Sequence, residues 1–147
     1  MSLDDVDRKI LGLLKQNTRL SFADIGLKVH LSAPAVHARV KKLENQKVIS
    51  RYTVDLNPDL VGSSLCAFIR IAKSRGTSTA LADELQKIKQ IEECHSVAGE
   101  DCLMIKLRVH SAIELSKILH RIREIEGVDR TVTAVVLETH FERGLQA

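Results

Sequence analysis

The feature that most constrains the fold is a pair of short amphipathic helices, separated by a tight turn, within residues 21–47. Ser21 can cap the first helix, with Asp24 as a capping-box partner, and Ser32 can cap the second. Each helix carries a single apolar stripe and is too short to be stable alone. The stripe of the first helix consists of Phe22, Ile25 and Val29. We therefore expect the two helices to pack against each other.

The second helix begins near Ala33 and has two chemically different faces. Val36, Val40 and Leu43 fall on one stripe that must be buried. On the opposite face, the side chains are small near the start of the helix and basic further along. The small side chains let the backbone approach base edges, and the basic ones can contact phosphates. We predict a DNA-binding surface made of Ser21, Ser32, Ala33, Pro34, Ala35, His37, Ala38, Arg39, Lys41, Lys42 and Arg51. An ordinary solvated charged face remains the alternative at this point.

The location of the charge favours the DNA-binding interpretation. Residues 1–60 hold 10 Lys and Arg against 7 Asp and Glu, whereas residues 61–147 hold 12 of each, so the first part carries the whole net charge of +3. Residues 28–51 contain six basic side chains and a single acidic one, Glu44. Such a patch is typical of proteins that bind polyanions. A membrane-surface helix would need larger apolar anchors than Val36 and Val40.

Two further elements complete the first part of the chain. Residues 4–16 place Val6, Ile10, Leu13 and Leu14 on one face of a third helix. Residues 48–56 favour a β-strand, acting as a wing or linker, that ends at Asn57-Pro58. We therefore expect a three-helix domain, with a strand as a wing or linker, at 1–60, followed by a second domain at 61–147.

The second domain shows the order β-α-β-β-α-β. Apolar residues alternate with other residues in two of the runs, and helical spacing separates the strands. The order predicts an α+β chain whose C-terminal part is a ferredoxin-like αβ sandwich with a four-stranded antiparallel sheet. The expected strands are 64–72, 93–98, 102–109 and 131–137, and the expected helices are 79–91 and one opened by the Ser111–Glu114 capping box.

Composition describes a soluble globular chain, with 44% apolar and 28% charged residues in 147. No apolar run approaches the roughly 20 residues of a membrane span, and the start MSLDDVD lacks the regions of a signal peptide. We therefore expect a cytoplasmic protein without membrane contact. The three cysteines, Cys66, Cys94 and Cys102, are odd in number and lie in strand-like runs, so no disulfide framework is expected.

Three other function classes fit the sequence poorly. RNA recognition on such a sheet needs stacking aromatics, which make up 3% of the chain and are missing from residues 102–109. Metal binding would need a ligand spacing that Cys94, His95 and Cys102 lack. Catalysis finds no phosphate-binding glycine loop, and Glu100-Asp101 sits on a turn. We predict neither an enzyme nor a metal protein.

Six short motifs follow one another along the chain. They are Leu3-Asp4-x-x-Asp7-x-x-Ile10-Leu11, Leu31-Ser32, Val36-x-x-Arg39-Val40-x-x-Leu43-Glu44, Ile49-x-x-Tyr52-Thr53, Leu56-Asn57-Pro58 and Val97-x-Gly99. No single motif is specific. Through the order and spacing of these motifs, the chain resembles the Lrp/AsnC (feast/famine) transcription regulators over its whole length.

The resemblance implies a prokaryotic, sequence-specific regulator of transcription that binds double-stranded DNA through a winged helix-turn-helix domain with a strand linker at 1–60. It also implies dimers that assemble into octamers or larger discs, and a small effector, often an amino acid, bound between dimers. No other cofactor is expected. By resemblance, the effector residues are Gly99, Glu100, Asp101, Cys102, Thr131 and Thr133. Backbone N–H groups of such a turn can hold a carboxylate, and an acidic side chain can hold an ammonium group.

This chain departs from the family pattern at two places. His30 stands in the turn between the DNA-binding helices, where the family usually has glycine. The effector loop, which in many members is Gly-x-x-Asp, is Gly99-Glu100-Asp101-Cys102 here, so the acidic group comes one position early. A competing hypothesis is a metabolite-binding oligomer in which the helical domain serves only assembly.

Overall fold

The computed structural model describes residues 3–74 and 76–145, which form two compact units. One unit runs up to Asp55 and also includes the chain from Glu142 onward. The other unit is Leu56–Phe141. The chain therefore passes between the two units twice.

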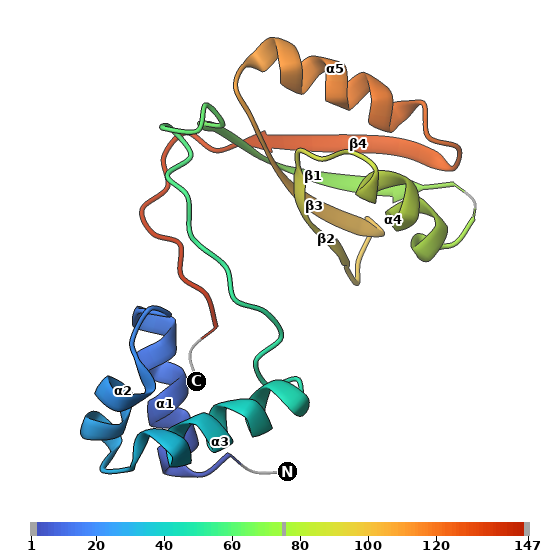
Figure 1. Cartoon of the computed structure of the whole chain (residues 1–147). Coiled ribbons are helices and arrows are strands. Elements are labelled where there is room, and N and C mark those ends of the chain that lie inside the picture. The colour runs from blue at the N-terminus through green and yellow to red at the C-terminus, as the bar shows by residue number, and fades with distance from the viewer. Residues whose placement is uncertain (1–2, 75, 146–147) are drawn as a thin grey trace. The chain divides into compact units, whose positions relative to one another are not determined.

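The first unit is a bundle of three short helices: α1 (Asp5–Gln16), α2 (Phe22–Val29) and α3 (Ala33–Asn45) (Figure 1). Each has the predicted side-chain cap, since Asp4, Ser21 and Ser32 accept hydrogen bonds from backbone N–H groups three residues on. The apolar stripes meet in one core, as the periodicity predicted. Its buried members are Ile10, Leu14, Ile25, Val29, Val36 and Val40.

The turn between α2 and α3 depends on two unusual backbone positions. His30 ends α2 in the left-handed conformation, with φ 58° and ψ 45°, which glycine adopts more easily than any other residue. Gly26 lies against the returning chain, where a Cβ atom would come within 2.4 Å of the carbonyl oxygen of Leu31. Gly26 therefore allows the chain to pass close to α2.

The predicted wing strand at 48–56 does not form: the structure has no strand between α3 and Leu65. The segment is irregular and largely exposed, and Tyr52, Val54 and Leu56 keep half or more of their surface accessible. A strand forms only when its backbone groups pair with another strand. The β propensity of the segment is therefore not enough to make a strand beside the helices, and this prediction was wrong.

The second unit contains the four-stranded antiparallel sheet that the sequence predicted (Figure 1). The strands are β1 (Leu65–Lys73), β2 (Ile91–Ser96), β3 (Leu103–Val109) and β4 (Val128–Val135). Their order in the sheet is β2-β3-β1-β4, with Ile69 of β1 paired to Ile105 of β3 and to Thr133 of β4. This is the strand order of the ferredoxin-like fold.

The helices α4 (Ser78–Gln86) and α5 (Ala112–Arg123) share one core with one face of this sheet. Alternate residues of β1 and β3 point into that core, together with Leu81 and Leu85 of α4 and Ile118 and Ile122 of α5. α4 ends five residues earlier than predicted, yet Ile88 in the turn beyond it is still buried. β4 begins three residues early because a register shift near Ala72 and Lys73 brings Val128 into the sheet.

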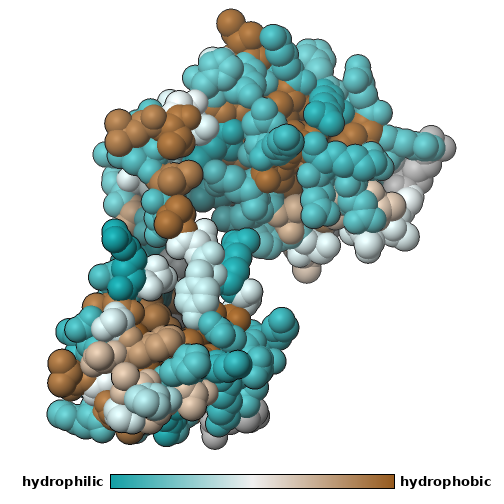
Figure 2. All heavy atoms as spheres, in the orientation of Figure 1, coloured by the Kyte–Doolittle hydropathy of each residue, from teal (hydrophilic) through white to brown (hydrophobic). Residues whose placement is uncertain are grey.

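Figure 2 shows one face of the molecule, on which hydrophobic residues are scattered among hydrophilic ones. No helix in the described ranges is long and apolar enough to cross a membrane. The three cysteines, all within the described residues, form no disulfide. Cys94 is exposed on the edge strand β2, Cys102 is half-buried and Cys66 is buried.

Gly26 and Gly12 form a matched pair for testing the close approach of Leu31. Gly26→Ala should destabilise the first unit by about 3 kcal/mol, because the new methyl group meets backbone that has little room to shift. Gly12→Ala, where a Cβ would meet nothing within 4 Å, should stabilise α1 by roughly 0.5–1 kcal/mol. Hydrogen exchange of the helical amides in the full chain measures both. Equal effects at the two positions would contradict this role of Gly26.

Candidate functional site

The two faces of α3 are separated as the sequence predicted. Val36, Val40 and Leu43 are at most 2% exposed. Ala33, Ala35 and Arg39 are half-buried on the flanks. The outward surface consists of Ser32, Pro34, His37, Ala38, Lys41 and Lys42. The side chains of this surface are mostly small near the start of α3 and basic toward its end.

Arg39 differs from the other predicted DNA-binding residues, because its guanidinium group is already paired. Its Nη1 donates to Asp4 Oδ2 and to Asp7 Oδ1, both at 2.7 Å. These hydrogen bonds, first to Asp4 and then to Asp7, raise the pKa of the guanidinium group. The backbone N–H of Asp7 and then Arg39 lower the pKa of the Asp4 carboxyl group.

Ser21 is occupied in a complete capping box at the start of α2. Its Oγ accepts a hydrogen bond from the backbone N–H of Asp24, and the Asp24 carboxylate accepts from the Ser21 hydroxyl at 2.6 Å. The Ser21 hydroxyl and backbone N–H lower the pKa of the Asp24 carboxyl group. The acidic partner makes the start of α2 a poor place for a phosphate.

His37 is supported from α2. Its ring lies 5.2 Å from the ring of Phe22, measured between centroids, at an angle of 36°. Since Phe22 is half-buried, this contact limits how far the exposed imidazole can swing. His37 is therefore presented to solvent in a restricted position beside Ala38.

The basic end of α3 is followed by two more exposed cations, Lys47 and Arg51. Glu44, the single acid in residues 28–51, accepts a hydrogen bond of 2.7 Å from the hydroxyl of Tyr52. Partial desolvation first, and then Glu44, raise the pKa of the Tyr52 hydroxyl to about 12.

The predicted effector turn lies between β2 and β3. Gly99 has φ 139°, a value that favours glycine, and Gly99 and Glu100 are exposed. Asp101 is only 8% exposed, and its two carboxylate oxygens lie 3.5 Å from the guanidinium nitrogens of Arg70 and Arg130. Asp101 is thus engaged by the protein itself, while Glu100 faces solvent.

The two predicted threonines belong to the other face of the sheet. Thr131 pairs with Ile71 and Thr133 with Ile69, so both share the face of the helical core. The Oγ1 of Thr131 accepts a hydrogen bond from Nε of Arg123 in α5. The cations that hold Asp101 come from the opposite face, since Arg70 pairs with Val132. Within one chain, the predicted effector residues, all of them described, therefore do not converge on one pocket.

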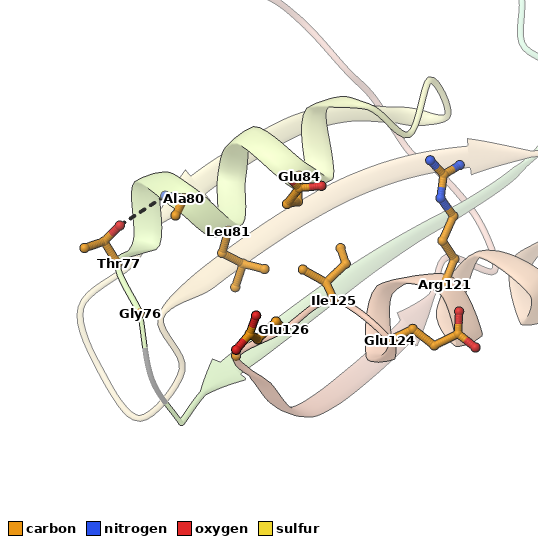
Figure 3. Close-up of a pocket in the computed structure, with 10 residues that line it drawn as sticks. Gly76, Thr77, Ala80, Leu81, Glu84, Arg121, Glu124, Ile125 and Glu126 are labelled. Carbon is orange, nitrogen blue, oxygen red and sulfur yellow. Dashed lines mark hydrogen bonds between the residues drawn. The ribbon is translucent and has the colours of Figure 1, made fainter.

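A hollow that the sequence did not predict lies between α4 and the turn after α5 (Figure 3). Its volume is about 640 Å³, and none of the predicted effector residues line it. Glu84 and Glu126 flank it around Leu81 and Ile125 in the close-up view. The acidic residues that line this hollow are of a kind common at exposed helix ends, so no motif in the sequence indicated it.

This geometry defines a class of protein: a helix-turn-helix unit joined to a separate αβ domain. Two family models match the chain. An AsnC-type helix-turn-helix domain matches residues 3–44, and the Lrp/AsnC ligand binding domain matches residues 66–146. The chain belongs to the Lrp/AsnC family of transcriptional regulators, which are not enzymes.

Relatives and solved structures agree with this assignment. The HTH-type transcriptional regulator FL11 of Pyrococcus abyssi is 34% identical over 97% of this chain and 94% of its own length. LrpA of Mycobacterium tuberculosis is 35% identical over 95% and 93%.

Among solved structures, AsnC of E. coli shares the fold with a TM-score of 0.93 at 24% identity, covering both chains fully. A feast or famine regulatory protein of M. tuberculosis, complexed with L-methionine, has a TM-score of 0.91 at 33% identity, over 99% and 100% of the chains. The predicted family is confirmed, and so is the predicted fold class of helix-turn-helix helices followed by a four-stranded antiparallel sheet with helices.

Proposed function

We propose that this regulator places α3 in the major groove of double-stranded DNA. The observation that carries the proposal is the division of α3, whose apolar stripe is buried while Ala38 and Lys41 are exposed on the opposite side. We assign base-edge contacts to the small half and phosphate contacts to the basic half. The proposed contacts are Ser32, Ala33, Pro34, Ala35, His37, Ala38, Lys41, Lys42 and Arg51. Ser21 is assigned to holding α2 through its cap.

We also propose a free amino acid as the effector, bound at the turn 99–102. The match to a ligand binding domain and the methionine complex of a structural neighbour support this class of ligand. Exposed Glu100 is the acid available for an ammonium group, because Asp101 is held by Arg70 and Arg130. The threonines on the other face would reach a ligand only from a second copy of the chain.

We propose that the regulator acts as dimers that assemble further. The irregular segment before β1 supports this, since Tyr52, Val54 and Leu56 are exposed apolar side chains. Two copies would present two α3 helices to half-sites about one helical turn apart. Sedimentation equilibrium of the full chain, alone and with single amino acids, measures the subunit number.

Selection of binding sites from random DNA duplexes by the full chain tests the proposed function. A bipartite consensus with half-sites about 10 base pairs apart, or a multiple of that, is expected. Failure to enrich any sequence at low salt would contradict DNA recognition and favour an assembly role for the helical unit.

Lys41→Ala with Lys42→Ala tests the phosphate contacts. Removal of each lysine should reduce the slope of log affinity against log salt by about 1 for each bound copy of the chain and weaken binding similarly on all sequences, because fewer counterions are released. Fluorescence anisotropy titrations at several salt concentrations measure the slope. The matched control is Lys89→Ala with Lys117→Ala, two exposed lysines of the second unit. An unchanged slope in the first variant would reject the assignment.

Ala38→Glu tests the base-reading half of α3. Ala38 is exposed, so the variant should stay folded, yet the carboxylate should abolish binding to the selected site. Ala38→Gln separates the effect of side-chain size from that of charge. Ser116→Glu is a control that adds the same charge at an exposed position of α5. Retention of full specific affinity by both Ala38 variants would show that another face contacts the bases.

Glu100→Gln tests the effector assignment. The variant should lose at least about 10-fold in affinity for the amino acid, because a buried or interfacial ammonium group loses its charged partner. Isothermal titration of the full chain measures it, after single amino acids have been screened for an effect on DNA binding. Glu93→Gln, on the neighbouring strand β2, is the control. Equal affinity in Glu100→Gln and the unchanged chain would remove Glu100 from the site.

A further inference from the structure

Arg39 of α3 contacts two carboxylates at the start of α1. They belong to Asp4 and Asp7, which lie 35 and 32 residues before Arg39 in the sequence. Asp4 has two tasks in this contact. Its Oδ1 caps α1 by accepting from the backbone N–H of Asp7 at 2.7 Å, and its Oδ2 accepts from Arg39. Asp7 supplies the second carboxylate from inside the same turn. One guanidinium group thus ties the cap and the first turn of α1 to α3.

The burial of Asp7 shows that the contact is part of the structure of the first unit. The side chain of Asp7 is 6% exposed, while that of Arg39 is 33% exposed. A carboxylate held away from water requires a cation or several donors close by. Arg39 supplies the cation at hydrogen-bond distance, so its release to a distant phosphate would leave Asp7 buried without this charge.

The position of Arg39 on α3 determines what this contact can fix. At about 100° per residue, Arg39 lies roughly 60° from the middle of the stripe Val36, Val40 and Leu43. Ala38 and Lys41 lie on the opposite side of the helix. An apolar stripe allows some rotation of a helix about its axis, because dispersion contacts are not directional. A short charged hydrogen bond on the flank is directional and removes that freedom.

We infer that Arg39 is a positioning residue for DNA recognition, which holds α3 at a fixed rotation through Asp4 and Asp7 and makes no phosphate contact of its own. The inference rests on the proposed role of α3. It assigns specificity to a contact that never touches DNA. The lysines supply sequence-independent affinity, whereas the Arg39 contact keeps the small face aimed at the bases.

Arg39→Gln and Asp7→Asn test the inference in the full chain, on the selected site and on a random duplex. Both variants should lower the ratio of specific to non-specific affinity by about 10-fold, with non-specific affinity and its salt slope unchanged. The double variant should be no worse than Arg39→Gln alone, because the contact that Asp7→Asn removes is one of the two that Arg39→Gln already removes. Arg39→Lys should recover part of the ratio, since an ammonium group can meet one carboxylate but lacks the planar fork.

Asp4→Asn keeps the test open if these variants unfold the first unit. Asparagine caps helices as well as aspartate does, so α1 keeps its cap while Arg39 loses one charged partner. We expect a smaller loss of the ratio, about 3-fold. Asp5→Asn is the matched control, because Asp5 is an exposed acid in the same first turn and the change in charge is identical. It should leave the ratio unchanged.

Three results would overturn the inference. A salt slope lowered by about 1 in Arg39→Gln, with parallel losses on both duplexes, would make Arg39 a phosphate contact. Tighter binding by Asp4→Asn or Asp7→Asn would mean that the carboxylates compete with DNA for the guanidinium group. An unchanged ratio in folded Arg39→Gln would leave the contact a purely structural role. If the unchanged chain itself lacks sequence preference, the proposed function fails instead.

Discussion

Burial of one face of α3 is the constraint on which the DNA-binding unit depends. Val36, Val40 and Leu43 can leave water only by packing against the other helices of the unit, and that packing decides which side chains remain outside. The outward face is then a consequence of the core. The same three residues that stabilise the unit also present Ala38 and Lys41 to solvent.

Two close contacts give this packing its geometry. Gly26 lets the chain turn tightly after α2, because a side chain there would strike the carbonyl group of Leu31. Arg39 ties α3 to the start of α1 through two carboxylates. The first contact sets the connection between the two helices and the second sets the rotation of α3. Neither contact uses a residue of the outward face, so the face is free to vary with the DNA sequence that it recognises.

Periodicity predicted most of the fold because each element buries one face. The caps at Asp4, Ser21 and Ser32 and the split β-α-β-β-α-β order follow from local patterns. Facts about partners distant in sequence could not be predicted this way. The strand expected at 48–56 finds no partner strand among the described residues. For the same reason, the pairing of Arg39 with two carboxylates could not be predicted, since Asp7 and Asp4 lie 32 and 35 residues away in the sequence. The resemblance grouped the threonines of β4 with the turn 99–102, but strand register places them on the other face of the sheet.

The central claim, that the outward face of α3 contacts DNA bases, is tested most directly by a photocrosslinking amino acid placed at position 38. The account predicts crosslinks to bases in the major groove of both half-sites, and none from the same group at exposed position 113 of α5. Crosslinks confined to the sugar-phosphate backbone, or equal yields from the two positions, would contradict it.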